Sequence, residues 1–327
     1  MKYIITGGAG FIGSHLARKL IGLGHEVLVI DNFSTGRLEN IQDLFTCSKF
    51  HLLTEDLLSI KDWRGIIGPG NTILHLAATV GVNKVCVDPL ITLNNNFLPT
   101  ISLLEFAAEK NCRFFFSSTA EVYGEMNKKS FSETDSLHIP GTHCGRSAYT
   151  LSKILSEQYS LNYARLYNLP VVVARLFNTI GPGQRSRYGM VVPTFISQAL
   201  RNEPITLFGD GMQSRCFCDV SDVLNAILLL LDNDDASGGI YNICGTKRVT
   251  IKDLALYVKR ITNSSSPIIS LPFPPQRADG RDVHSRCGNI TKIKDHVNWE
   301  PRISWTESIK TILTEESKCV HTKLEIL

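Results

Sequence analysis

Tyr149 and Lys153 have the residue types and the spacing for proton transfer. They lie four residues apart in the segment Tyr149-Thr150-Leu151-Ser152-Lys153, which would place both side chains on one face of a helix. A tyrosine with an ordinary pKa of about 10 is a poor base at neutral pH. A lysine cation at ~4 Å, at an effective dielectric constant of about 20, contributes about 4 kcal/mol and would lower the pKa of the phenol by roughly three before desolvation opposes it. Such a pair also occurs on ordinary amphipathic helices, so its meaning depends on its surroundings.

A glycine-rich turn near the start of the chain supplies that context. The segment Thr6-Gly7-Gly8-Ala9-Gly10-Phe11-Ile12-Gly13 follows a predicted strand and opens a predicted helix. Gly7 permits a tight turn, Gly10 lets the backbone approach a pyrophosphate, and Gly13 lets the helix sit close to the sheet. The anion would rest on free N–H groups at the start of the helix. Asp31, 18 residues after Gly13, would bind the adenosine ribose and repel a 2′-phosphate, so the sequence predicts NAD rather than NADP.

The elements that must position these residues alternate between short apolar runs and helical patterns over the first 180 residues. This alternation is typical of βαβ units with a parallel sheet. We therefore predict an α/β fold: a doubly wound Rossmann domain over residues 1–180, which carries the catalytic residues, and a smaller α/β substrate domain mainly over 181–327. The predicted strands are Lys2–Ile5, Glu26–Ile30, Phe50–Leu53, Thr72–His75, Arg113–Ser117 and Pro170–Ala174, and the predicted helices are Phe11–Leu23, Leu90–Glu109 and Ala148–Tyr167.

The composition excludes several other classes of protein. The formal net charge of +3 gives no basic field for nucleic acid. The longest apolar run, near Ala226–Leu231, is far shorter than the ~20 residues that a membrane helix needs. The nine cysteines are scattered and none has zinc-ligand spacing, so we expect reduced thiols, no metal site and a cytoplasmic protein. No secretion signal is expected, because residues 1–5 already form a predicted strand.

Taken together, the motifs resemble the extended short-chain dehydrogenase/reductase superfamily, and more narrowly its nucleotide-sugar epimerase/dehydratase branch. The resemblance covers almost the whole chain. It is carried by the glycine-rich turn, the Tyr/Lys pair, Asp31-Asn32, Asp56-Leu57, His75-Leu76-Ala77-Ala78, Ser118-Thr119-Ala120-Glu121-Val122-Tyr123-Gly124, Arg175-Leu176-Phe177-Asn178, Gly209-Asp210-Gly211-Met212-Gln213-Ser214-Arg215 and Trp299-Glu300-Pro301.

The resemblance implies a role for each matching position. Thr119 would hydrogen-bond the sugar hydroxyl, Tyr149 would take its proton, and Lys153 would bind the nicotinamide ribose. The bound NAD would remove hydride from C4 of the sugar and later return it. The implied cofactor-binding residues are Gly7, Gly10, Phe11, Ile12, Gly13, Asp31, Asn32, Asp56, Leu57, Leu76, Ala77, Ala78, Asn96, Ser117, Tyr149 and Lys153. The implied substrate-binding residues are Asn178, Val192, Arg215 and Arg286.

Glu121 bears on which reaction follows oxidation at C4. In this branch, 4-epimerases usually carry no acid at this position, whereas 4,6-dehydratases and UDP-glucuronate decarboxylases carry a glutamate. A carboxylate there could remove the C5 proton, which a C4 ketone acidifies. Ala120 stands where the commonest dehydratases have an aspartate that protonates the leaving hydroxyl. The sequence therefore predicts a Glu121-assisted dehydratase or decarboxylase, and leaves open a UDP-hexose 4-epimerase or a non-enzymatic NAD-binding sensor.

Two arginines remain ambiguous at this level. Arg286, in a loop that resembles one that closes over the nucleotide sugar, could pair with a diphosphate or with a substrate carboxylate, because a guanidinium matches both. Arg146, just before the catalytic tyrosine, could be functional or simply solvated. The expected partner is a nucleoside-diphosphate sugar, UDP-linked, with neither nucleic acid nor membrane involved. A homodimer built on the helices Leu90–Glu109 and Ala148–Tyr167 is also expected from the resemblance.

Overall fold

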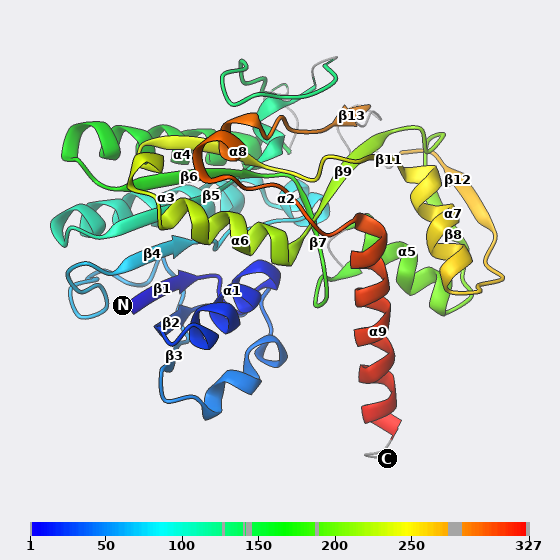
Figure 1. Ribbon diagram of the computed structural model, residues 1–327, viewed down its shortest axis with the longest axis horizontal. Coiled ribbons are helices and arrows are strands. Elements are labelled where there is room, and N and C mark those ends of the chain that lie inside the picture. Colours follow the sequence, from blue (N-terminus) through cyan, green and yellow to red (C-terminus); the bar gives the residue numbers. More distant parts are fainter. Residues whose placement is uncertain are drawn as a thin grey trace.

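The central feature of the computed structural model is a sheet of seven parallel strands in the order β10-β6-β5-β4-β1-β2-β3 (Figure 1). The structure describes residues 2–125, 128–139, 141, 146–186, 190–273 and 283–324. The strand order reverses between β1 and β4, and ligand sites of doubly wound sheets form at such a reversal. The predicted Rossmann architecture is confirmed. The strands are β1 (Lys2–Thr6), β2 (Glu26–Ile30), β3 (Phe50–Leu53), β4 (Thr72–His75), β5 (Arg113–Thr119), β6 (Val171–Leu176) and β10 (Gly239–Ile243).

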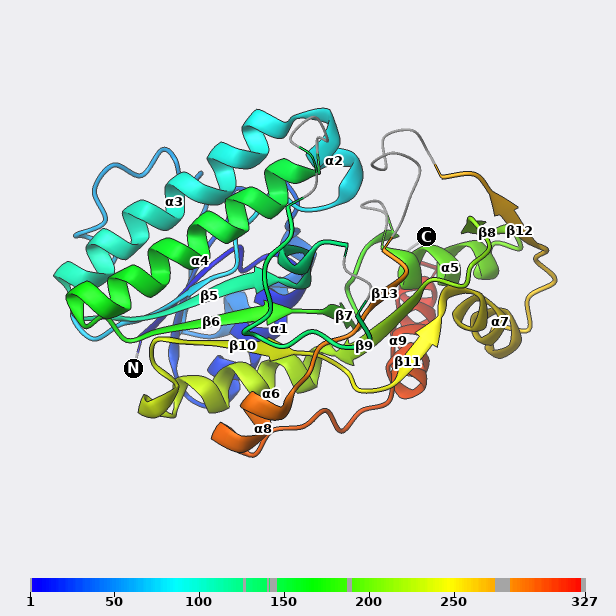
Figure 2. The same ribbon diagram turned by 90° about the horizontal axis from the view of Figure 1, so that it is seen from above.

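Helices cover both faces of this sheet, with α1 (Phe11–Gly22) and α6 (Val220–Leu231) on one face and α3 (Pro89–Glu109) and α4 (Ser147–Tyr167) on the other (Figures 1 and 2). Successive strand residues point to opposite faces. Ile5 and Val29 therefore pack in the core that contains α1 and α6, whereas Ile4 and Leu28 pack in the core that contains α3. The near-continuous apolar strands are what a sheet buried on both faces requires. The short helix α2 (Val82–Val87) precedes α3.

A smaller unit lies beyond the carboxyl ends of the sheet strands (Figure 2). Its core joins apolar side chains of α5, α7 and α9 to the strands β7, β8, β9 and β11. Its elements are β7 (Asn178–Ile180), α5 (Val191–Leu200), β8 (Ile205–Phe208), β9 (Ser214–Asp219), β11 (Arg248–Thr250), α7 (Ile251–Ile261), β12 (Ile268–Leu271), β13 (Ser285–Arg286) and α9 (Trp305–Leu324). The described 3-10 helices are η1 (Leu38–Asn40), η2 (Gln42–Thr46), η3 (Ala120–Tyr123) and η5 (Asp234–Ala236).

The second half of the chain also returns to the large sheet. After β9 it forms α6, which packs on α1, and then β10, which pairs with β6 at the edge of the sheet. Later, α8 (Thr291–Val297) places Ile293 in the same core as α1 and α6. The predicted boundary at residue 180 therefore marks where the chain first leaves the large sheet, and not where its contribution to that sheet ends.

The expectation of reduced thiols is wrong for two cysteines. Cys216 and Cys287 form a disulfide, with their Cα atoms 5.3 Å apart. The reason is the pairing of β13 with β9, which brings together positions that are 71 residues apart in the sequence. Of the other cysteines, Cys47, Cys86, Cys112, Cys218 and Cys244 are outside disulfides. Among the described residues, no helix combines the length and the apolar character that crossing a membrane would require.

Candidate active site

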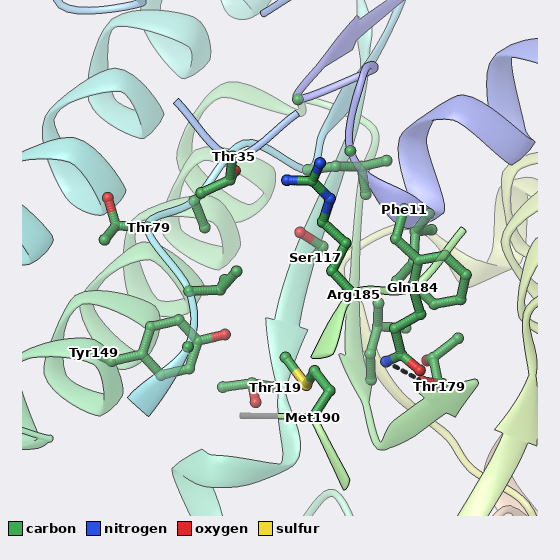
Figure 3. A pocket seen from close by; sticks show the side chains of 18 of the residues that line it. Phe11, Thr35, Thr79, Ser117, Thr119, Tyr149, Thr179, Gln184, Arg185 and Met190 are labelled. Atoms are coloured by element: carbon green, nitrogen blue, oxygen red, sulfur yellow. Dashed lines mark hydrogen bonds between the residues drawn. The ribbon is translucent and has the colours of Figure 1, made fainter. Parts of the chain in front are cut away.

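One cavity of about 590 Å³ runs from the glycine-rich turn to the smaller unit. It is lined by the first helical turn of α1, by the carboxyl ends of sheet strands and by side chains of α4, α5, β9 and β13. Figure 3 shows Tyr149 and Thr119 on one side of it, with Phe11 and Gln184 on the other. With one exception, every residue predicted above to bind cofactor or substrate, or to act in catalysis, lines this cavity.

The exception is Asn96, whose predicted contact with the cofactor the structure does not place in the cavity lining. Its buried amide is fully engaged with protein groups: Oδ1 accepts from the N–H of Thr79 at 2.6 Å, and Nδ2 donates to the carbonyl of Thr79 at 3.2 Å and to Ser152 at 3.3 Å. Thr79 itself lines the cavity. Asn96 therefore links the loop that contains Thr79 to Ser152 of α4.

The glycine-rich turn is shaped for close approach of backbone atoms. Gly7 has a φ of +71°, and a Cβ there would lie 2.8 Å from the backbone of Ala77. A Cβ on Gly13 would lie 2.3 Å from the carbonyl oxygen of Gly7. The N-cap of α1, Gly10, offers no side chain to the N–H groups of the first turn. These N–H groups, at the positive end of the helix dipole, fit a pyrophosphate.

Asp31 is fixed at the end of β2, beside this turn. Its carboxylate accepts hydrogen bonds from the N–H groups of Ala9 and Phe33, both at 2.9 Å. Burial raises the pKa of Asp31, and these two hydrogen bonds oppose the rise. Each hydrogen bond leaves lone pairs of the carboxylate available for a ribose hydroxyl. The turn and the carboxylate together fit the adenosine diphosphate part of NAD.

The polar groups of Asn32 and Asp56 extend the same end of the cavity. Asn32 donates to Asp56 at 2.8 Å, and the other oxygen of Asp56 accepts from the N–H of Leu58 at 2.9 Å. Two neighbouring strand ends, those of β2 and β3, are thereby held together. The adenine and its ribose would bind beside Asn32 and Asp56, whose side chains are already held by these hydrogen bonds.

Lys153 is buried in the cavity lining, where it donates to the carbonyl of Ser117 at 2.7 Å and lies over the ring of Phe116. Burial lowers its pKa to about 7, against the opposing charge of Glu157. Glu157 in turn forms a buried ion pair with Arg175 at 2.7 Å, and it accepts from Ser118. The ammonium is thus held between the end of β5 and a fixed carboxylate one helical turn further along α4.

Tyr149 differs from the expectation raised by its spacing from Lys153. Its pKa lies above the ordinary value, because burial and the carboxylate of Glu121 raise it more than a hydrogen bond with Thr119 and the charge of Arg146 lower it. The predicted lowering by Lys153 is not the dominant effect. In this state the phenol keeps its proton, and Thr119 is its hydrogen-bonding partner.

Glu121 forms ion pairs with two arginines, Arg146 and Arg286. Arg146 pairs with it through both oxygens, at 2.8 and 3.2 Å, and Arg286 approaches one oxygen at 3.7 Å. Burial raises the pKa of Glu121, but Arg146, Arg286 and Arg215 outweigh that effect and hold the pKa at about 2. The carboxylate is therefore ionised over the physiological range. General bases work best with a pKa near the working pH, so Glu121 is a weak base.

The smaller unit contributes the far wall of the cavity. Asn178 begins β7, Val192 lies in α5, and Arg215 lies in β9, where its guanidinium donates to the carbonyl of Val283 at 2.8 Å. Arg286 sits beside Arg215 in the register of β13 and β9. Two arginines of the predicted substrate site therefore come from adjacent strands. Of the loop that the resemblance places before Arg286, residues 274–282 lie outside the described part of the chain.

Several lining residues were missed by the sequence analysis. Gln184, Arg185 and Met190 face the cavity in Figure 3, and Gln184 donates to the carbonyl of Thr179 at 3.0 Å. The sequence analysis singled out none of these three residues. Phe208 also lines the cavity, just before the motif that starts at Gly209. Irregular segments like these carry no periodic signal.

Comparison with known proteins matches this chain to one family model and to enzymes that act on UDP-sugars. The model of the NAD dependent epimerase/dehydratase family matches residues 3–244. UDP-glucuronic acid decarboxylase 1 of Arabidopsis thaliana is 36% identical over 96% of this chain and 69% of its own length. UDP-N-acetyl-alpha-D-glucosaminuronate decarboxylase of Bacillus cytotoxicus is 34% identical over 94% of this chain and 95% of its own length.

Two solved structures show how far the resemblance extends in three dimensions. UDP-glucose 4-epimerase of Thermotoga maritima, with UDP-glucose, aligns with a TM-score of 0.88 at 30% identity and covers 98% of this chain and 100% of its own. UDP-glucuronic acid 4-epimerase of Bacillus cereus, in complex with UDP-glucuronic acid and NAD, aligns with a TM-score of 0.84 at 30% identity and covers 95% and 97%.

Replacing Lys153 by methionine should stabilise the cofactor-free protein while it abolishes turnover. The buried ammonium costs stability, because its pKa falls from 10.5 to about 7 on folding. This cost is full below pH 7 and shrinks as the pH rises from about 7 toward 10.5, where the unfolded chain also loses the proton. We expect Lys153→Met to raise the free energy of unfolding by about 1–3 kcal/mol at pH 6, and by less at pH 9. Denaturant titration at both pH values measures the change.

Lys49→Met, at an exposed lysine far from the cavity lining, serves as the control for that measurement. A stability difference for Lys153→Met that is the same at both pH values would show that the ammonium is not the source of the cost. Turnover should fall at least ~10²-fold, because the cavity that holds Tyr149 loses its buried ammonium, which donates to the carbonyl of Ser117.

Proposed function

Since the chain belongs to the NAD dependent epimerase/dehydratase family, we propose that it is an NAD-dependent decarboxylase of a UDP-linked hexuronate. Its cofactor is NAD, and it is an enzyme of the nucleotide-sugar branch, as the sequence predicted. The observation that carries the finer proposal is the meeting of Arg146 and Arg286 at Glu121, beside Tyr149 and Thr119. Two guanidiniums around one carboxylate can accept a second carboxylate, that of a uronic acid.

Decarboxylation also suits the protonation state of Glu121. NAD, when bound, accepts hydride from C4 of the sugar and returns it, and the C4 ketone makes the uronate a β-keto acid. The bond from C5 to the carboxylate then breaks, its electron pair moves to the C4 oxygen, and C5 later takes up a proton. Tyr149 and Thr119 are placed to stabilise the charge on that oxygen. No base is needed to remove a proton from C5, which fits a Glu121 whose pKa is about 2.

Dehydration at C6 is less well supported by the side chains present. It needs an acid near the sugar to protonate the leaving hydroxyl. Among the described residues that line the cavity, the acidic ones are Asp31, Glu55, Asp56 and Glu121. The first three stand near the ends of β2 and β3, on the cofactor side, and Glu121 is ionised and paired. Ala120 is apolar and buried.

We assign Glu121 a balancing role in this proposal. Two unopposed guanidiniums would bind the uronate carboxylate tightly in the ground state. In the transition state the negative charge moves from that carboxylate toward the C4 oxygen, and the carboxyl group departs as neutral carbon dioxide. An interaction stronger in the ground state than in the transition state slows the reaction. By pairing with Arg146 and Arg286, Glu121 moderates their hold on the substrate carboxylate. This role replaces the predicted abstraction of the C5 proton.

A second candidate is a 4-epimerase that acts on a UDP-hexuronate. The observation that favours it is the close structural match to UDP-glucuronic acid 4-epimerase of Bacillus cereus. The same arginines would bind the same carboxylate in that case. The two candidates differ in the carboxylate on C5, which only the decarboxylase removes, and in C4, whose configuration the epimerase inverts.

The purified protein should convert UDP-glucuronate to a product lighter by the mass of carbon dioxide. Mass spectrometry of the reaction mixture, run beside UDP-glucose and dTDP-glucose, separates the candidates. A product of unchanged mass but altered configuration would instead identify the epimerase. Loss of water from any of these sugars would contradict both candidates.

Glu121→Gln tests the balancing role in the same assay. This variant should bind UDP-glucuronate more tightly and turn it over more slowly, so that KM and kcat both fall. If Glu121 were instead the base that removes the C5 proton, the variant would accumulate a 4-keto sugar with reduced cofactor and stop there. Glu55→Gln, at the cofactor end of the cavity, is the matched control.

Arg286→Lys should weaken binding of UDP-glucuronate by about tenfold or more, because lysine keeps the charge but loses the planar fork. The comparison ligand is UDP, which has the diphosphate but no sugar carboxylate. If Arg286 binds the carboxylate, the affinity for UDP should change little. An equal loss for both ligands, measured by calorimetry, would place Arg286 on the diphosphate instead.

We further propose that two copies of the chain associate through α3 and α4. The two helices lie side by side along one face of the molecule (Figure 2). Leu155, Tyr159 and Leu166 of α4 are 41%, 40% and 64% exposed, and their spacing places them along one stripe. Leu98 of α3 is 44% exposed. A second copy related by a two-fold axis would cover the stripe on α4 together with Leu98 of α3.

Light scattering should therefore give twice the mass of one chain. The double variant Leu155→Glu/Tyr159→Glu places charges in the stripe and should give the mass of a single chain. Arg165→Glu, also exposed on α4, is the control and should leave the mass unchanged. A monomeric wild-type protein would contradict the proposal.

A further inference from the structure

The Cys216–Cys287 disulfide joins the two strands that carry the substrate arginines. Cys216 directly follows Arg215 on β9, and Cys287 directly follows Arg286 at the end of β13. The parallel register pairs Arg286 with Arg215. Because successive residues of a strand point to opposite faces, the arginines turn to the cavity while the cysteines turn away from it. The two sulfur atoms lie in an apolar cluster with Tyr123, Phe131, Phe177 and Cys244.

Besides its pairing with β9 and the hydrogen bond from Arg215 to the carbonyl of Val283, backbone hydrogen bonds among the described residues hold β13 in this register. The strand is two residues long. Around it, Ser214 donates to the carbonyl of His284 at 2.8 Å, and the backbone of Phe131 exchanges hydrogen bonds with Cys287 and Asn289 at 2.9 and 2.7 Å. In longer strands many hydrogen bonds fix the register. In this two-residue strand, the disulfide adds a covalent link at Cys287, the position next to Arg286.

We propose that Cys216 and Cys287 are positioning residues whose disulfide keeps Arg286 beside Arg215 and thereby sets the affinity for the nucleotide sugar. The identity of that sugar rests on the proposed function, but the effect on the two arginines does not. Binding groups that are held in place before the ligand arrives cost less ordering on binding. Opening the disulfide should therefore weaken substrate binding and leave the cofactor end of the cavity unchanged.

The neighbouring thiol does not compete for this bond. Thiol–disulfide exchange requires a thiolate that attacks one sulfur and releases the other. Burial raises the pKa of Cys244 to about 12, so that its thiolate is scarce at neutral pH. An external dithiol opens the bond by giving it two electrons and two protons, and is itself oxidised to a disulfide. The two states can thus be prepared and compared.

The test compares Cys216→Ala/Cys287→Ala with Cys244→Ala. All three positions lie in the same apolar cluster, but only the double variant breaks the link. Mass mapping of the unreduced native protein should find the peptides of Cys216 and Cys287 joined. Calorimetry in a Tyr149→Phe background, which prevents turnover, should give an affinity for UDP-glucuronate roughly tenfold lower in the double variant. Retention of NAD should not change.

Hydrogen exchange over residues 283–289 gives a readout that needs no ligand. Exchange should be faster in the double variant, and in native protein treated with dithiothreitol, than in Cys244→Ala. Faster exchange with unchanged affinity would reduce the disulfide to a merely structural role and overturn the proposal, as would unchanged exchange or unjoined peptides. If the native protein binds UDP-glucuronate without releasing carbon dioxide, the proposed function fails while the affinity comparison still decides this inference. If it binds no uronate, UDP is the probe.

Discussion

The buried ion pair between Glu157 and Arg175 is the interaction on which the catalytic geometry depends. Both side chains are almost fully buried, and removing one partner of such a pair typically costs about 3–5 kcal/mol. Glu157 lies on α4 and also accepts from Ser118, which precedes Thr119, while Arg175 donates to Tyr123, which follows Glu121 by two residues. One ion pair therefore fixes the helix of Tyr149 and Lys153 relative to the strand end that carries Thr119. Tyr123 passes the constraint on to Asn242 of β10 at 2.7 Å.

The charged groups of the site differ in how firmly their protonation states are fixed. Burial lowers the pKa of Lys153 to about 7, so that its protonation state at neutral pH responds to what binds beside it. The carboxylate of Glu121 is locked in its charged form by arginines. A group near its pKa suits proton transfer, whereas a permanently charged group suits the recognition of an ion. In the proposed function the substrate carboxylate is recognised by the arginines around Glu121, Arg146 and Arg286, and not by Glu121 itself.

Local patterns predicted the large sheet well, because its strands and helices are regular and apolar. Glu26–Ile30 and Thr72–His75 form strands at the predicted bounds, and Tyr149 and Lys153 share the cavity with the glycine-rich turn. What escaped prediction depends on contacts between distant segments. Arg146 was ambiguous because its partner, Glu121, lies 25 residues away, and burial reversed the expected pKa of Tyr149. Asn96 was predicted to bind the cofactor, but its amide binds Thr79 and Ser152 outside the cavity lining, since a motif indicates a residue's neighbourhood and not the direction of its amide.

The return of the second half of the chain to the large sheet limits how such an enzyme can change its substrate. A chimera made by joining residues 1–180 to the second half of a relative would exchange the wall that faces the sugar. It would also exchange α6, α8 and the edge strand β10, whose Asn242 anchors Tyr123. The part that recognises the sugar is therefore not a module that can be traded as a block. Under the proposed function, we expect a change of sugar to come from replacements around a shared scaffold, at positions such as Arg146 and Arg286.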